Sequence, residues 1–336
     1  METERPIVVT GTAGFIGFHL AQSLLAEGRR VIGVDVVNDY YPTMVKRRRL
    51  AMLADQPGFE FVEADLAEQE PVDTLFRRER PELVCHLAAQ AGVRYSLEHP
   101  RAYITSNIDA TLNILEAGRH FEVKRLVYAS SSSVYGGNTK VPFSEDDPVE
   151  TPISLYAATK RSNELMAHTY THLFGLPTVG LRFFTVYGRW GRPDMAMWIF
   201  TENILRGKPI PVFNRGEMKR DFTHVSDIVQ GIRGSLFADG LEPYEVFNLG
   251  NHQCEELTRL IEIIEQACGR EAIRDLKPMQ PGDVPATWAD IERAQRKLGF
   301  QPTTPVEQGV PDFVAWYREQ PEIAEAALAW RASGGA

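Results

Sequence analysis

Cysteine is scarce in this chain of 336 residues, which contains three: Cys85, Cys254 and Cys268. An odd number of cysteines, with neither a Cys-x-x-Cys pair nor clustered histidines, favours neither a disulfide framework nor a zinc site. We therefore expect no bound metal, and we interpret the three thiols as buried apolar side chains.

Long apolar runs are missing as well. No stretch approaches the length of a membrane span, and the opening residues Met-Glu-Thr-Glu-Arg have neither the basic start nor the apolar core of a signal peptide. The composition, 43% apolar and 24% charged, is typical of a globular protein. We expect a cytoplasmic protein that makes no contact with a membrane.

Positive charge is in deficit. The chain has 36 lysines and arginines against 45 aspartates and glutamates, a formal net charge of -9. Neither nucleic acid nor an anionic membrane is attracted by an acidic protein, so we expect no nucleic-acid partner. An anionic substrate must therefore be bound by local positive groups.

Glycine, in contrast, is concentrated near the start of the chain. The β-branched run Ile7–Val9 leads into Thr-Gly-Thr-Ala-Gly-Phe-Ile-Gly over residues 10–17, and an amphipathic pattern follows over residues 18–26. This order of strand, glycine turn and helix is typical of dinucleotide binding, because glycines let the backbone approach a pyrophosphate at a helix N-terminus. The residues expected to bind the cofactor here are Gly11, Gly14, Phe15, Ile16 and Gly17.

An acidic residue ends the next predicted strand. Asp35 lies 21 residues after Gly14, where a carboxylate binds the adenosine ribose hydroxyls and repels a 2′-phosphate. We therefore expect NAD rather than NADP, with Asn38 also near the cofactor. The basic run Lys46–Arg49 could instead bind a 2′-phosphate. We interpret that run mainly as a solvated helix face.

Further predicted strands are followed directly by polar or small residues. Residues 59–63 alternate like a strand and lead to Asp65 and Leu66, and residues 83–87 are followed by small side chains. A helix is expected over residues 98–120, and a fifth strand over residues 125–129 runs into four serines. From these segments we expect cofactor contacts from Asp65, Leu66, Leu87, Ala88 and Ala89.

The pentapeptide Tyr-Ala-Ala-Thr-Lys, residues 156–160, carries two groups that suit proton transfer. On a helix, Tyr156 and Lys160 share one face, and a nearby ammonium group favours the phenolate form of a tyrosine. Such a phenolate can take a proton from an alcohol. The spacing alone is also common on solvated helices, so the assignment depends on the other motifs.

These motifs together resemble the extended short-chain dehydrogenase/reductase family, and within it the nucleotide-sugar epimerases and dehydratases. The glycine turn, the serines before Val134-Tyr135-Gly136, and Tyr156 with Lys160 carry the resemblance, which covers nearly the whole chain. It implies Ser131 as a hydroxyl donor, Tyr156 as acid and base, and Lys160 as the cation that lowers the tyrosine pKa and holds the nicotinamide ribose. Ser133 remains the alternative to Ser131.

The positions just before Val134 bear on the reaction. Dehydratases and decarboxylases of this family typically carry an acid there, whereas this chain has Ser132 and Ser133. Without that acid, oxidation at C4 followed by return of the hydride to the other face, an epimerisation, is favoured. Serines also suit a substrate carboxylate, which needs hydrogen-bond donors.

The chain is most similar to the UDP-glucuronate 4-epimerases, which implies the substrate contacts. These contacts are expected at Arg94, Ser132, Ser133, Thr185, Arg192, Arg220 and Asp283. Gln280 replaces an arginine that the broader family often has before the Pro-Gly-Asp element, which departs from the pattern near Asp283.

The predicted fold is α/β: a doubly wound parallel sheet of the Rossmann type over residues 1–184, followed by a smaller mixed α/β substrate-binding domain over residues 185–336. Some of the later segments are expected to return to the first domain. The resemblance also implies a homodimer, built from the helix near residues 98–120 and the Tyr156 helix of each subunit.

The predicted function is C4 epimerisation of UDP-glucuronate to UDP-galacturonate with NAD, without net oxidation or decarboxylation. Three alternatives stay open. Two are enzymes, a UDP-glucuronate decarboxylase and a UDP-glucose 4-epimerase. The third is a noncatalytic NAD-binding sensor, because a fold does not determine a function.

Overall fold

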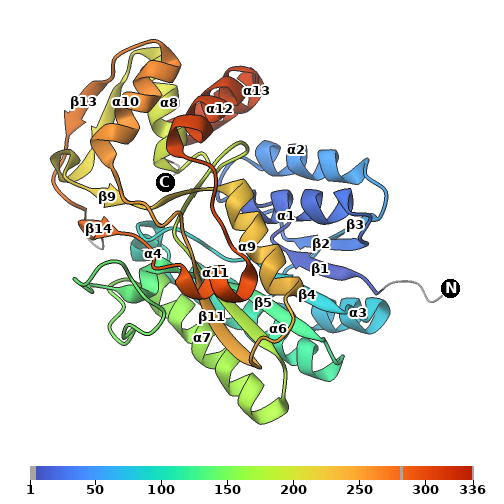
Figure 1. The fold of residues 1–336 in the computed structure, drawn as a ribbon. Coiled ribbons are helices and arrows are strands. Elements are labelled where there is room, and N and C mark those ends of the chain that lie inside the picture. The colour runs from blue at the N-terminus through green and yellow to red at the C-terminus, as the bar shows by residue number, and fades with distance from the viewer. Residues whose placement is uncertain (1–4, 281–282, 335–336) are drawn as a thin grey trace.

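Seven parallel strands form the central sheet, in the order β11-β6-β5-β4-β1-β2-β3 (Figure 1). The computed structural model describes residues 5–280 and 283–334. The strands are β1 Ile7–Thr10, β2 Val31–Asp35, β3 Phe59–Glu63, β4 Leu83–His86, β5 Arg125–Ser131, β6 Thr178–Phe183 and β11 Tyr244–Leu249. The strand order reverses between β1 and β4, and ligands of such sheets bind outside the carboxyl ends at this point. The predicted doubly wound fold is confirmed.

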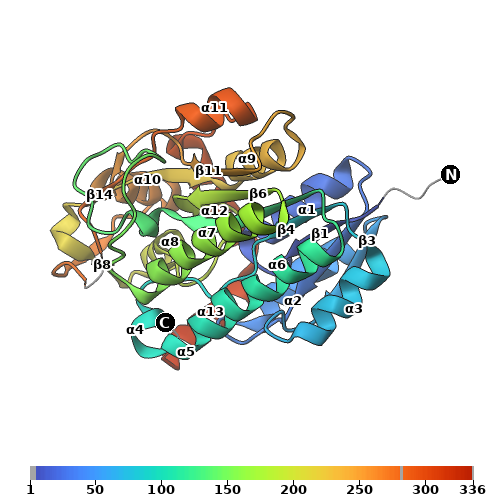
Figure 2. The ribbon, with the colours of Figure 1, turned by 90° about the horizontal axis from the view of Figure 1, so that it is seen from below.

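Successive residues of the strands point to opposite faces of the sheet, and the residues on both faces are apolar. Helices therefore cover both faces. Val9 of β1 packs into one buried cluster and Val8 into another, on opposite faces. On one face lie α1 Phe15–Ala26, α2 Thr43–Ala54 and α9 Val225–Phe237; on the other lie α3 Gln69–Glu79, α6 Ala110–His120 and α7 Leu155–Phe174. Figure 2 shows α6 and α7 side by side in front of the sheet.

The helix expected over residues 98–120 is interrupted. The structure has α4 Tyr95–Glu98, α5 Pro100–Tyr103, a π-helical segment η1 Ile104–Asp109, and then α6. Pro100 lacks a backbone N–H and therefore starts a new helix. In the π-helical segment the carbonyl of Asn107 accepts a hydrogen bond from the Asn163 side chain at 2.7 Å. The interruption thus ties this segment to α7.

The chain beyond residue 184 forms several small sheets. They pair β7 Thr185–Tyr187 with β10 Phe222–His224, β8 Pro209–Val212 with β13 Ile273–Leu276, and β9 Lys219–Arg220 with β12 Glu255–Glu256 and β14 Ala286–Thr287. Their helices are α8 Ala196–Arg206, α10 Leu257–Cys268, α11 Glu292–Leu298, α12 Val306–Arg318 and α13 Pro321–Ala332. Two later segments, α9 and β11, return to the central sheet. Residues 185–336 therefore do not all lie outside the layers of that sheet.

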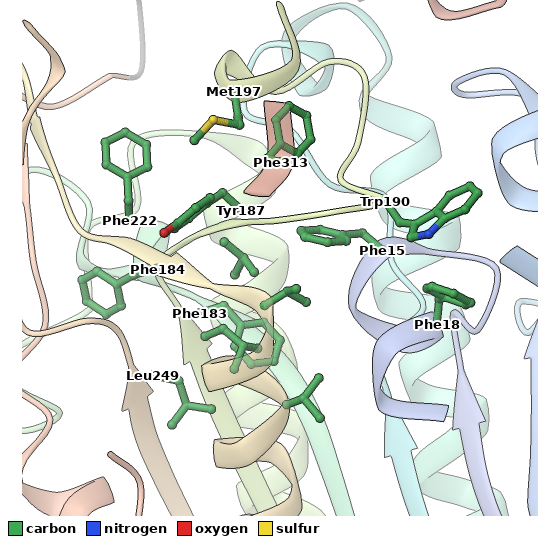
Figure 3. Close-up of a cluster of buried hydrophobic side chains, with 14 of the residues drawn as sticks. Phe15, Phe18, Phe183, Phe184, Tyr187, Trp190, Met197, Phe222, Leu249 and Phe313 are labelled. Carbon is green, nitrogen blue, oxygen red and sulfur yellow. The ribbon is translucent and has the colours of Figure 1, made fainter. Parts of the chain in front are cut away.

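One aromatic core joins the two parts (Figure 3). Phe18 of α1 packs edge-on against Trp190, with ring centroids 5.9 Å apart, and Trp190 packs against Trp316 of α12 at 5.3 Å. Because the loop that carries Trp190 is part of this core, it is held in a fixed position over the glycine turn. No helix in the described ranges is long and apolar enough to cross a bilayer.

Candidate active site

The glycine turn between β1 and α1 has no room for side chains. A Cβ on Gly11, whose φ is +73°, would lie 2.7 Å from the amide nitrogen of Ala88, and one on Gly17 would collide with the Gly11 carbonyl. Helix α1 begins after Gly14, and no side chain caps its N-terminus. The first amides of α1 and its dipole are therefore available to an anionic group such as a pyrophosphate.

Asp35 connects the end of β2 to this turn. Its carboxylate accepts hydrogen bonds from the amides of Ala13 at 3.1 Å and Val37 at 2.8 Å. Burial raises the pKa of Asp35, while the Val37 amide and the charge on Lys46 oppose that rise. The nearby Asn38 is exposed, and its side-chain oxygen accepts from Lys46 at 2.6 Å.

The basic run on α2 is not a uniformly solvated face, so that interpretation was wrong for two of its four residues. Lys46 and Arg49 are 6% and 0% exposed, because three residues of spacing place both on the inner side of the helix. Arg49 donates to the carbonyl of Ala13 at 2.7 Å and to that of Trp190 at 2.6 Å. It therefore ties the glycine turn to the loop after β7.

The other predicted cofactor residues lie at the ends of β3 and β4. The carboxylate of Asp65 accepts from the amide of Ala67 at 2.9 Å, and the adjacent Leu66 is 5% exposed. The amides of Leu87 and Ala88 both donate to the Thr10 hydroxyl at 3.1 Å, and Ala89 follows with partial exposure.

Thr10 and His86 form a buried pair that was not predicted from the sequence, and they lie opposite each other in the register of β1 and β4. The Thr10 hydroxyl and the His86 Nδ1 are 2.8 Å apart, and burial lowers the pKa of His86 to about 3. The imidazole is therefore neutral. The strand pattern offered no signal that this histidine would be a hydrogen-bonding partner for the residue before the glycine turn.

Taken together, these residues fit NAD. The uncapped α1 helix suits its pyrophosphate and Asp35 its adenosine ribose, and Gly11 lets the backbone of the turn lie against that of Ala88. Across the part of the chain that the structure describes, no group of three or more His, Cys, Asp or Glu side chains is placed to hold a metal ion.

Tyr156, Lys160 and Ser131 meet at the carboxyl end of β5. The Ser154 hydroxyl accepts from the Ala157 amide at 3.1 Å and caps α7, which places Tyr156 in its first turn. Lys160, 4% exposed, donates to the Ala129 carbonyl at 2.9 Å. A hydrogen bond with Ser131 acts on the Tyr156 phenol, which favours Ser131 over Ser133 as its hydroxyl partner.

Two groups lower the pKa of the Tyr156 phenol in this structure. Burial raises the pKa of Tyr156, while the Ser131 hydrogen bond and the positive charge on Arg192 lower it. Arg192, from the loop after β7, is thus a cation that favours the phenolate. Lys160 instead directs its ammonium group to the backbone of β5, one residue before the serines.

The four serines have different surroundings. Ser130 is buried and donates to Glu164 at 2.7 Å, so it belongs to the structural pair of Glu164 and Arg182. Ser131 accepts from the Ser133 amide at 3.1 Å, which folds Ser132–Tyr135 into a short 3-10 helix, η2. Ser132 and Ser133 are partly exposed on it.

Arg192 is not a solvated loop residue. Its Nε and Nη2 donate to the two carboxylate oxygens of Asp194 at 3.0 and 2.6 Å, and its side chain is 20% exposed. Arg192, Thr185 and Phe15 line one cavity. The cavity therefore joins a predicted cofactor residue of α1 to two predicted substrate residues.

A second group of predicted substrate residues lies together elsewhere. Arg94 lies 3.6 Å from the carboxylate of Asp283 and stacks over the ring of Phe213 at 4.3 Å. Burial lowers the pKa of Arg220, and the charge on Asp283 opposes this. Two cations and one carboxylate from three distant segments thus form a net positive group, which suits a diphosphate.

The comparisons with known proteins agree with this geometry. Residues 7–250 match the model of the NAD dependent epimerase/dehydratase family. The chain is 50% identical to Protein CapI of Staphylococcus aureus over 93% of its own length and 98% of that protein's. It is 45% identical to a probable UDP-glucuronate 4-epimerase of Rhizobium meliloti, over 92% of this chain and 96% of that protein.

Among solved structures, the fold is similar to that of the UDP-glucuronic acid 4-epimerase from Bacillus cereus, determined in complex with UDP-glucuronic acid and NAD. The TM-score is 0.88 at 34% identity, and the match covers 94% of this chain and 99% of that one. The family match spans most of the chain and includes the glycine turn, the serines and Tyr156. The chain therefore belongs to the NAD dependent epimerase/dehydratase family, and the predictions of an extended short-chain dehydrogenase/reductase fold and of NAD as cofactor are confirmed.

Proposed function

We propose that this protein is the 4-epimerase that interconverts UDP-glucuronate and UDP-galacturonate through a 4-keto sugar, with no net oxidation and no loss of carbon dioxide. The observation that carries the proposal is the placement of Tyr156 against Ser131, with the acid-free pair Ser132 and Ser133 beside them. Relatives that are named for this reaction support it.

Tyr156 removes the proton of the C4 hydroxyl and later returns one to the C4 oxygen. Ser131, which already hydrogen-bonds the phenol, shares the developing charge on that oxygen. NAD, when bound, supplies the acceptor and then the donor of the C4 hydride. Lys160, whose ammonium is fixed by the Ala129 carbonyl, holds the nicotinamide ribose.

Epimerisation is favoured over elimination because positions 132 and 133 are serines rather than acids, and the carboxylate that Ser130 contacts, that of Glu164, is buried in an ion pair with Arg182. Removal of a proton next to a 4-keto group requires a base, and Ser132 and Ser133 are poor bases. They do offer hydroxyl donors to the carboxylate at C5 of the sugar. Thr185 and the Arg192 guanidinium, which line a cavity together, offer further donors.

A 4-keto uronate is prone to lose carbon dioxide, because its carboxylate lies β to the ketone. The breaking bond must overlap the carbonyl π system, so a carboxylate held near the ketone plane is protected. Four donors from two separate segments, η2 and the stretch from Thr185 of β7 to Arg192 in the loop after it, can hold it in this way. The diphosphate of the substrate is assigned to Arg94 and Arg220, which Asp283 orients.

The test is incubation of the purified protein with UDP-glucuronate without added NAD, followed by identification of the product by NMR. UDP-galacturonate supports the proposal. A UDP-pentose would identify a decarboxylase, and turnover restricted to UDP-glucose would identify the epimerase of the neutral sugar. Bound NAD with no turnover of either sugar would favour the sensor.

A further inference from the structure

Asp194 holds the Arg192 guanidinium from one side. The bond is bidentate, through Nε and Nη2, and the second carboxylate oxygen also accepts from the Tyr40 hydroxyl at 3.2 Å. The Asp194 side chain is 9% exposed. Burial alone would raise the pKa of Asp194, but the charge and hydrogen bonds of Arg192 outweigh it and keep the pKa below its usual value. Asp194 is therefore a carboxylate.

The loop that carries this pair is fixed at both ends. Arg49 of α2 donates to the carbonyl of Trp190, and Arg331 of α13 donates to the carbonyl of Pro193 at 2.7 Å. Arg192 and Asp194 flank Pro193, so neither can swing away from the other without breaking buried hydrogen bonds. The pair is thus a permanent feature of the cavity that Arg192 lines with Thr185.

The geometry limits what Arg192 can offer a ligand. A guanidinium has five N–H donors in a rigid fork, and the Nε and Nη2 edge is already used by Asp194. A second carboxylate can be bound only through the three remaining N–H groups, two on Nη1 and one on Nη2, and it would lie near the negative charge of Asp194. Arg192 therefore binds an anion more weakly than an unpaired buried arginine would.

We propose that the negative charge of Asp194 weakens the binding of the substrate carboxylate by Arg192, so that the 4-keto sugar can rotate within the site. The inference rests on the proposed function. Epimerisation at C4 requires the sugar to present one face when hydrogen leaves and the other when it returns. A full ion pair between Arg192 and the carboxylate would anchor the sugar in one orientation, whereas a shared guanidinium positions the carboxylate and still releases it.

Asp194→Asn tests this, because it keeps the shape and one acceptor but removes the charge. We expect the dissociation constant of UDP-glucuronate, measured by calorimetry, to fall and kcat to fall as well, each by about tenfold. Binding of UDP-glucose, which has no carboxylate, should not change. In an Arg192→Ala background the same substitution should have no effect on uronate affinity, because Asp194 acts through Arg192.

Asp312→Asn is the matched control. Asp312 also pairs with an arginine of this loop, Arg189, but the pair is exposed. That variant should bind UDP-glucuronate like the parent. If Asp194→Asn does not fold, Asp194→Ser removes the same charge and keeps an acceptor in a smaller side chain, and it should show the same tighter binding with slower turnover.

The outcomes separate the inference from the proposed function. A parent protein that does not convert UDP-glucuronate would overturn the proposed function and this inference with it. A parent that epimerises UDP-glucuronate, with an Asp194→Asn variant that binds it more weakly or equally well, would overturn the inference alone. Weaker binding together with a lower melting temperature would mean that Asp194 has a structural role.

Discussion

Lys160 lies one turn after Tyr156 on α7, yet its ammonium group is directed to the Ala129 carbonyl of β5, at 2.9 Å. Burial lowers the pKa of Lys160 to about 8. The charge is therefore present below that pH and is lost as the pH rises through about 8. A buried lysine at this point suits a role in holding a hydroxyl-bearing ligand beside Tyr156, as well as joining the helix to the sheet.

Lys160→Met should therefore reduce both turnover and the amount of NAD that co-purifies with the protein. The loss of turnover is expected to be about tenfold or more, because a lost charged hydrogen bond is worth about 1.5–3 kcal/mol. In the parent, kcat/KM should decline as the pH rises above about 8. Lys124→Met, at an exposed lysine, is the control for the loss of one charge. Unchanged NAD content in Lys160→Met would contradict the ribose role.

Asp35→Ala should shift the preference of the protein from NAD toward NADP, because it removes a ribose acceptor and the repulsion of a 2′-phosphate. It also removes the hydrogen bonds to Ala13 and Val37, so both affinities should fall. Asp35→Asn separates these effects, since it can still accept from a backbone amide but carries no charge. The ratio of the two dissociation constants is the measurement. If neither variant changes that ratio, Asp35 does not select the cofactor.

We expect a homodimer through α6 and α7. Among the apolar residues of these helices, Leu115 is buried and Met166 packs against the protein's own core, whereas Leu112 and Leu165 are 40% and 53% exposed. The exposed pair faces away from the sheet and is available to a second copy. Light scattering should therefore give a mass near twice the 37.8 kDa of one chain.

Leu165→Glu should shift that equilibrium to the monomer, because it places a charge in the apolar contact. Ile273→Glu changes an equally exposed apolar residue, 54%, on β13 and should leave the mass unchanged. A parent protein with the mass of a single chain would rule out the dimer.

Arg192→Ala should impair UDP-glucuronate far more than UDP-glucose, because the uronate alone has a carboxylate to bind. Each lost charged hydrogen bond is worth about 1.5–3 kcal/mol, so the loss in kcat/KM should be tenfold or more. The variant should also release some UDP-pentose, since a loosely held carboxylate can rotate out of the ketone plane. Equal losses on both sugars without pentose would remove Arg192 from the carboxylate site.

The parts of the fold and site that were predictable share a local cause. The glycine turn, Asp35 and the five strands up to β5 follow from spacing and alternation within short segments. Tyr156 and Lys160 share a face because one helical turn separates them. Each of these features depends on residues close in the sequence.

The features that were not predicted depend on distant contacts. Arg49 is buried because its donors meet the carbonyls of Ala13 and of Trp190, 141 residues away. A basic run gives no sign of such partners, and the same holds for Arg331, which holds Pro193 from α13. The Arg192 and Asp194 pair is local in sequence, but its burial depends on the aromatic core that encloses the loop.

The central claim is that hydrogen leaves C4 of the uronate and returns to the same carbon. The direct measurement is mass and NMR analysis of the product formed from UDP-glucuronate labelled with deuterium at C4, without added NAD, with Tyr156→Phe as the inactive control. We predict UDP-galacturonate that retains the deuterium at C4. Product that has lost the deuterium to solvent, or a UDP-pentose as the main product, would contradict the claim.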